Sequence, residues 1–255
     1  MRTVKSEFKD VFKAPMEEEG FTYAGNTFYR HVNDVLQTFT LRKTCCTLHF
    51  RFGIFPVCIP ISEFLPCGIL YPVERYVEGR ARPFSYPYEP KDVRGLMEQG
   101  LEVVKREAIP VFRSGIDCKS AYDTVVNAQS RMFTGDPNRM VLHDICLRWM
   151  ALKNKDYEHA YVHHISMIAL NLGLIRHETI LADLLQPEVR ERLETITEND
   201  SSRLIELKTV LHHIMQKDDD FFQALIDRNT QITLSFLEKV RKSPCKYGKG
   251  DCILF

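Results

Sequence analysis

The fold of the first half is decided by the stretch Phe21-Thr-Tyr-Ala-Gly-Asn-Thr-Phe-Tyr-Arg30 and its continuations, Val35-Leu-Gln-Thr-Phe-Thr-Leu-Arg42 and Thr47-Leu-His-Phe-Arg-Phe-Gly-Ile-Phe-Pro56. Polar and apolar residues alternate here with a period of two, which is typical of antiparallel strands with one buried face. We expect a meander of three strands, with a possible bulge at Gly25-Asn26, because both residues tolerate positive φ. The residues expected on the buried face are Phe21, Tyr23, Thr27 and Tyr29, then Val35, Gln37, Phe39 and Leu41, then Leu48, Phe50, Phe52 and Ile54.

The other face of this sheet is expected to be polar. Its members alternate with the buried residues of the second and third strands: Thr38, Thr40, Arg42, His49 and Arg51. Antiparallel sheets commonly have one solvated face, so a plain hydrated surface is one interpretation. The alternative is a face that receives a ligand or a partner, with His49 and Arg51 as its binding residues.

The N-terminal pattern resembles a bacterial family of uncharacterised domains. An amphipathic helix at 6–19 precedes Gly20-Phe21, then Gly25-Asn-Thr-Phe-Tyr-Arg30, and then Gln37 in an alternating strand. The resemblance covers roughly residues 5–56 and extends to about residue 130. It implies α+β character and a bacterial cytosolic origin, and it implies no catalytic residues.

The segment between residues 56 and 90 contains seven prolines and lacks a regular pattern. We expect an irregular loop, and long loops within compact domains are often functional. Its arginines could bind a carboxylate bidentately, and its tyrosines offer the contact area found at interface hot spots. The binding residues expected in this loop are Arg75, Tyr76, Arg80, Arg82 and Tyr86. The alternative is a proline-stiffened excursion whose aromatic residues pack on the sheet and whose arginines pair with nearby glutamates.

Helical periodicity dominates the remainder of the chain. Helices are expected at 92–106, 118–132, 140–153, 157–172, 179–185, 187–196, from a cap at Ser201 or Ser202 to about 214, and at 218–242. Thr134-Gly-Asp-Pro137 is a strong break, because it combines glycine, an N-cap aspartate and a proline suited to the first helical turn. We therefore predict an α+β fold: a small antiparallel sheet covered by helices in a domain of residues 1–135, and an all-helical subdomain of residues 136–255.

Composition narrows the classes of function. The 255 residues carry a formal net charge of zero, which disfavours a dedicated nucleic-acid binder. The N-terminus has no apolar signal-peptide region, and no run approaches the ~18 apolar residues of a membrane span. The eight cysteines form no Cys-x-x-Cys pair. We expect a cytoplasmic protein without a membrane span, with reduced and mostly buried thiols.

Catalytic and metal-binding motifs are scarce. His159 and His163 stand four residues apart on a predicted helix, a spacing that is weak evidence for zinc. We predict no metal site and no cofactor. The terminal Cys252-Ile-Leu-Phe255 matches a prenylation pattern, but four-residue matches arise easily, so we interpret Cys252 as a coincidence.

These observations favour a non-enzymatic binding protein whose partner is another protein, with an immunity-like or regulatory role as one form of it. Two alternatives stay open. One is an enzyme or small-ligand binder with a cleft between the two halves, and the other is a weak nucleic-acid binder that uses the loop of residues 71–88.

Overall fold

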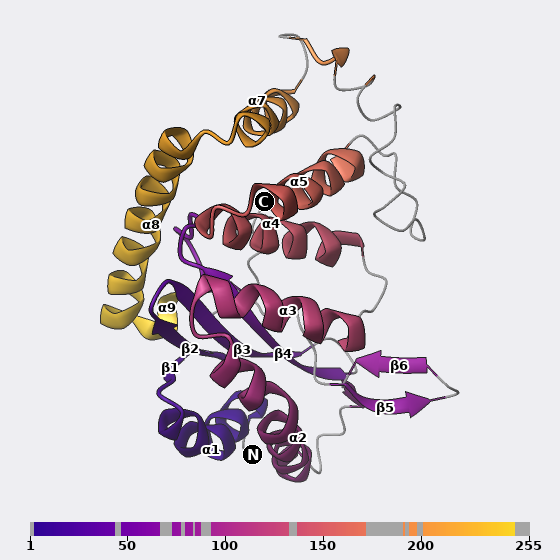
Figure 1. Cartoon of the computed structure of the whole chain (residues 1–255). Coiled ribbons are helices and arrows are strands. Elements are labelled where there is room, and N and C mark those ends of the chain that lie inside the picture. The colour runs from indigo at the N-terminus through magenta and orange to yellow at the C-terminus, as the bar shows by residue number, and fades with distance from the viewer. Residues whose placement is uncertain are drawn as a thin grey trace. The chain divides into compact units, whose positions relative to one another are not determined.

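The computed structural model describes residues 3–43, 47–66, 73–77, 80–83, 85–87, 93–132, 137–171, 191, 194–197 and 201–247. The chain is α+β, with an antiparallel sheet in its first half and helices in its C-terminal half, as the sequence predicts (Figure 1). Contacts divide it into a unit of residues 1–134 and 229–255 and a unit of residues 135–228. The sequence predicts one helical subdomain over residues 136–255, whereas the structure groups residues 229–255 with the sheet.

The main sheet of the first unit has the strand order β1-β2-β3-β4-β7, and its neighbours are antiparallel. The strands are β1 (Thr22–Ala24), β2 (Thr27–Val32), β3 (Val35–Lys43), β4 (Thr47–Pro56) and β7 (Ser85–Pro87). A separate two-stranded sheet consists of β5 (Val73–Val77) and β6 (Arg80–Pro83). The helices of this unit are α1 (Val4–Glu18), α2 (Val93–Ser114), α3 (Cys118–Met132), the second half of α8 (Asp219–Lys242) and α9 (Pro244–Tyr247).

The predicted single strand over residues 21–30 is wrong, because the chain turns back at Gly25 and Asn26. Tyr23 pairs with Phe28, and Gly25 adopts a φ of +71°, which glycine reaches without steric cost. The two residues form a hairpin turn and not a bulge. Because of this turn, Thr27 and Tyr29 lie on the face of the sheet opposite Tyr23. The residues that the sequence analysis expected on one buried face are therefore divided between the two faces.

The first face of the sheet packs against α1 and α2 through phenylalanine rings. Phe8 of α1 lies 5.3 Å from Phe28 and 5.7 Å from Phe39, measured between ring centroids. Phe8 is fully buried, as are the two strand residues. Helix α2 approaches so closely that a Cβ on Gly100 would lie 2.4 Å from the ring of Phe50. The apolar residues that alternate along β3 and β4 thus face a tightly packed core. At residue 100 this core has no room for a side chain larger than that of glycine.

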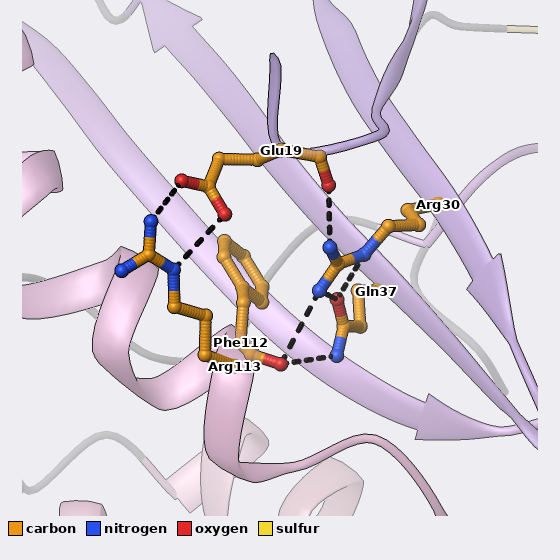
Figure 2. Close-up of polar contacts among 5 residues, drawn as sticks. All are labelled: Glu19, Arg30, Gln37, Phe112 and Arg113. Atoms are coloured by element: carbon orange, nitrogen blue, oxygen red, sulfur yellow. Dashed lines mark hydrogen bonds and ion pairs between the residues drawn. The ribbon is translucent and has the colours of Figure 1, made fainter. Parts of the chain in front are cut away.

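A buried polar contact joins this face to the C-terminal ends of α1 and α2 (Figure 2). The side-chain amide of Gln37 donates to the carbonyl oxygens of Phe112 and Gly115, at 2.8 Å each. Its Oε1 accepts from Nε of Arg30 at 2.9 Å and from Nη2 at 2.6 Å, and Arg30 also donates to the backbone oxygen of Glu19. Gln37 is completely buried, so these bonds satisfy its amide and fix two helix ends on the sheet.

The second face of the sheet is buried at its centre, and of its expected polar members only Arg42 is exposed. Thr38 and Thr40 have no exposed area, and Thr40 Oγ1 lies 3.2 Å from Thr27 Oγ1. Tyr29, on the same face, interacts electrostatically with residues of α8, and burial raises the pKa of its hydroxyl. The hydroxyl of Thr233 in α8 donates to the carbonyl oxygen of Ile59 and accepts from the N–H of Ile61, at 2.6 and 3.0 Å. The expectation of a hydrated face therefore fails at Thr38 and Thr40, and the C-terminal half of α8 lies beside Tyr29 and binds the residues that follow β4.

The second unit is helical in its described residues, with α4 (Pro137–Lys153), α5 (Tyr157–Asn171), α7 (Ser202–Gln216) and the first half of α8. Ser201 caps α7 as predicted, accepting from the N–H of Leu204. The helix expected at 179–185 lies outside the described residues, and that at 187–196 is described only at 191 and 194–196. None of the helices within the described ranges is long and apolar enough to cross a membrane.

The aspartates at the start of α8 form specific hydrogen bonds and ion pairs, in addition to their favourable interaction with the helix dipole. Asp218 accepts from the N–H of Phe221 at 3.0 Å and from Nδ1 of His213 at 2.9 Å, and these bonds lower the pKa of its carboxyl group. Asp219 binds Nζ of Lys155 and the hydroxyl of Tyr157, at 2.6 and 2.5 Å. The two aspartates therefore hold the α7–α8 corner and join it to the turn before α5.

Candidate functional site

Strands β5 and β6 pair as the two arms of a β-hairpin where the sequence predicts an irregular loop (Figure 1). That prediction is wrong for residues 73–77, 80–83 and 85–87, which form strands, whereas residues 57–65 are irregular as expected. Pro83 is the last residue of β6 and Pro87 the last of β7, where a missing N–H is tolerated. The sequence signal for the hairpin was weak: Glu78-Gly79 separates the strands, but Arg80-Ala-Arg-Pro83 has no β-branched or aromatic residue.

The register of the hairpin places three of the predicted binding residues on one face. Arg75 is the direct partner of Arg82, and Arg80 is the partner of Val77. Since every second residue of a strand belongs to the same face, Arg75, Arg80 and Arg82 share one face of the strand pair. We call these three positions the arginine face. The structure describes the backbone of these strands, and the side chains of residues 73–87 lie outside the description.

The other predicted binding residues are not on the arginine face. Tyr76 pairs with Ala81 and therefore belongs to the opposite face of the hairpin. Tyr86 is in β7 and pairs with Leu48, in the main sheet. His49 and Arg51 are in β4, where both are half-buried. The structure thus divides the predicted binding residues among the arginine face, the opposite face of the same hairpin (Tyr76) and the main sheet (His49, Arg51 and Tyr86).

The second unit contains a buried group of titratable side chains that the sequence analysis did not assemble. Asp144 of α4 binds two residues of α5, His163 through Nδ1 at 2.9 Å and Ser166 through its hydroxyl at 2.7 Å. All three are less than a tenth exposed. Asp144 and Ser166 escaped notice because each is a single polar residue on a helix, and only the packing of α4 on α5 brings them together.

A second buried contact lies beside it and joins three helices. Nη1 of Arg148 lies 2.9 Å from Nδ1 of His164, whose Nε2 lies 2.7 Å from the carbonyl oxygen of Leu207 in α7. Arginine only donates and a carbonyl only accepts, so His164 is neutral with its proton on Nε2. Burial, and then the charge of Arg148, lower the pKa of His164 to about 3.

The order of these groups favours a structural role. In nucleophilic catalysis the imidazole lies between hydroxyl and carboxylate, so that it can remove the hydroxyl proton. Here the carboxylate of Asp144 lies between Ser166 and His163, and Ser166 is 1% exposed. Such an arrangement fixes helix packing but does not present an activated hydroxyl to a substrate.

The two histidines considered for zinc have different surroundings. The ring of His159 is exposed and its Nδ1 lies 2.7 Å from Asp156, whereas His163 is buried against Asp144. Among the described residues, no three histidine, cysteine, aspartate or glutamate side chains are grouped so that they could hold a metal ion. Cys252 lies outside the described residues.

Comparisons with protein-family models, with curated proteins and with solved structures give no match. The resemblance of residues 5–56 to a bacterial family of uncharacterised domains stays a prediction. The candidate site therefore depends on the geometry of this chain alone, and the arginine face is its strongest feature.

Proposed function

We propose that the chain is a non-enzymatic interaction protein that binds an acidic surface of another protein through the arginine face. The observation that carries the proposal is the register of β5 and β6, which sets Arg75 directly opposite Arg82 and puts Arg80 on the same face. Arginine forms bidentate hydrogen bonds with carboxylates and is enriched at the centres of protein interfaces.

The energetics of an isolated hairpin support this proposal. Like charges directly opposite one another destabilise a strand pair, by an amount comparable to the ~0.2–1 kcal/mol of a favourable pair. A two-stranded hairpin has little stability of its own, and among the described elements the main support of this one is α3, on the β6 side. Carboxylates of a partner would neutralise the arginines and remove this repulsion, so binding and ordering of the hairpin would reinforce each other.

A competing function is nucleic-acid binding through the same three residues. Phosphate contacts would make the affinity fall steeply with salt, by roughly one power of the salt concentration for each phosphate contacted. The zero net charge of the chain gives no wider positive field to support that function. The alternative of an enzyme with a cleft between the halves stays a prediction, as does an immunity-like or regulatory role.

The test compares two triple variants of the full chain. In the first, Arg75, Arg80 and Arg82 become serine. In the matched control, three exposed arginines outside the hairpin, Arg106, Arg228 and Arg241, become serine. Proteins captured from lysate of the source organism, with and without nuclease treatment, are quantified by mass spectrometry. Each candidate is then purified and its Kd is measured at several salt concentrations.

We expect to capture a partner with acidic surface residues. Its affinity for the hairpin variant should be at least about ten-fold lower than for the unchanged chain, because each truncated hot-spot residue costs more than ~1 kcal/mol. Its affinity for the control variant should stay within about two-fold. Equal affinity for both variants would contradict the proposal. Loss of capture on nuclease treatment, with a steep salt dependence, would favour the nucleic-acid function instead.

A further inference from the structure

We infer that the hairpin binds its partner by strand addition: an extended segment of the partner, with acidic residues at every second position, pairs with the outer edge of β5. This inference rests on the proposed function and adds to it the conformation and the charge pattern of the bound segment. It is argued from the backbone of the two strands, their edges and their register.

The two edges of the hairpin are not equivalent. Helix α3 contacts β6, which Figure 1 shows on the side of the hairpin nearer to α3, with β5 outside it. Strand β6 also ends in Pro83, which has no N–H to offer a further strand. Strand β5 has the sequence Val-Glu-Arg-Tyr-Val and contains no proline. In the described residues β5 pairs with β6 and with no other strand, so its outer edge is the better place for a third strand.

The register then specifies the charge pattern of that third strand. An added strand would lie about 4.8 Å from β5, with every second residue on the arginine face. Acidic residues at those alternate positions would be direct neighbours of Arg75, whereas Arg80 and Arg82 lie one strand further away, at about 10 Å, where only long side chains can meet. The intervening residues would lie on the other face, beside Tyr76.

The irregularity in β5 limits the length of the paired segment. Val73 pairs with Pro83 and Arg75 with Arg82, so Glu74 is an extra residue in β5. Bulges bend a strand and disrupt its ladder, so we expect pairing mainly along Arg75–Val77. This length accommodates at most two alternate acidic residues, opposite Arg75 and Val77.

The test uses fluorescein-labelled peptides of about ten residues, a length that covers a typical strand. One peptide alternates glutamate with threonine over its central six residues or so, and the second has the same composition with its glutamates in one block. Two further versions of the alternating peptide carry N-methyl groups on alternate backbone nitrogens, one version for each set. Binding to the full chain is measured by fluorescence anisotropy.

Strand addition predicts that the alternating peptide binds at least about ten-fold more tightly than the block peptide. It also predicts that one N-methylated version loses binding while the other keeps it. The reason is that alternate residues of an antiparallel strand direct their N–H groups to opposite sides. The Arg82→Thr variant removes the arginine–arginine opposition and adds a good strand former, so it favours the hairpin while weakening recognition. We expect it to bind the alternating peptide several-fold more weakly.

The outcomes separate this inference from the proposed function. Equal binding of both peptides, insensitive to N-methylation but lost in the triple serine variant, overturns strand addition and leaves the acidic partner in place. Binding that is unchanged in the triple serine variant contradicts both. Tighter binding by Arg82→Thr, or no binding of the alternating peptide at millimolar concentration, also overturns strand addition.

Discussion

Replacing Gln37 with leucine should destabilise the first unit far more than removing an exposed ion pair a few ångströms away. Leucine fills nearly the same volume but leaves the carbonyl oxygen of Gly115 without the amide donor and takes the Oε1 acceptor away from Arg30. Phe112 keeps one donor, Nη2 of Arg30 at 3.3 Å. Gln37 has no exposed area, so water cannot replace the lost bonds without rearrangement.

The magnitude follows from counting bonds. The two hydrogen bonds from the Gln37 amide to carbonyl oxygens contribute about 1 kcal/mol each. The two bonds from the charged Arg30 to Oε1 of Gln37 contribute about 1.5–3 kcal/mol together, since Arg30 keeps its other acceptors. Burial of the apolar surface of leucine stabilises the folded state by about 1 kcal/mol. We therefore expect the free energy of unfolding to fall by about 3 kcal/mol.

The matched control is Arg113→Ala, which removes the contacts at 2.5 and 3.2 Å with Glu19 (Figure 2). The Arg113 side chain is 67% exposed, and ion pairs of exposed side chains contribute little to stability. Urea titration followed by circular dichroism measures the change in the free energy of unfolding. Hydrogen exchange in peptides that cover β2 and β3 shows whether this change is in the first unit. A loss for Gln37→Leu no larger than that for Arg113→Ala would refute the reasoning.

Three further predictions concern the core and the buried histidine. Phe8→Ala should lower the free energy of unfolding by about 3–5 kcal/mol in urea titration, because it removes a fully buried ring. Gly100→Ala should cost about 1–3 kcal/mol in the same assay, because the added Cβ would lie 2.4 Å from a core ring; an unchanged midpoint would show that the helix shifts freely. The pKa of His164 is 6.5 in the unfolded chain and about 3 when folded, so the stability that depends on its neutral form is complete above pH 6.5 and is lost as the pH falls towards 3. Between pH 8 and pH 5 this loss should reach about 2 kcal/mol, followed by the fluorescence of Trp149, the single tryptophan; His164→Gln should flatten the dependence and the exposed His159→Gln should not.

Local patterns were sufficient for the elements whose signals are local. The alternation of β3 and β4 and the periodicity of α3, α5, α7 and α8 predicted these elements within a few residues. The cap at Ser201 was predicted as well, because an N-cap bonds to the backbone three residues along the same helix. Each of these signals involves neighbours in the sequence, so a single sequence can reveal it.

Signals that depend on distant neighbours misled the prediction. Gly25-Asn26 suits a bulge and a tight turn equally, and the pairing of Tyr23 with Phe28 decides between them. The polar residues Thr38 and Thr40 indicated a wet face, but both are buried, and α8, almost two hundred residues later, lies beside this face. Burial of a strand face depends on what packs on it, which the strand's own sequence does not contain.

By itself the sequence determined the α+β class, most helices and the central strands, and it directed attention to the arginines of residues 75–82. The tertiary structure decided which of those residues belong together, since it placed Arg75 opposite Arg82 and left Tyr86 and His49 in the main sheet. It also assembled Asp144 with His163 and Ser166 across two helices. The physical reason is that strand register and helix packing are set by pairing between segments, so the chemistry of a face exists only once the chain has folded.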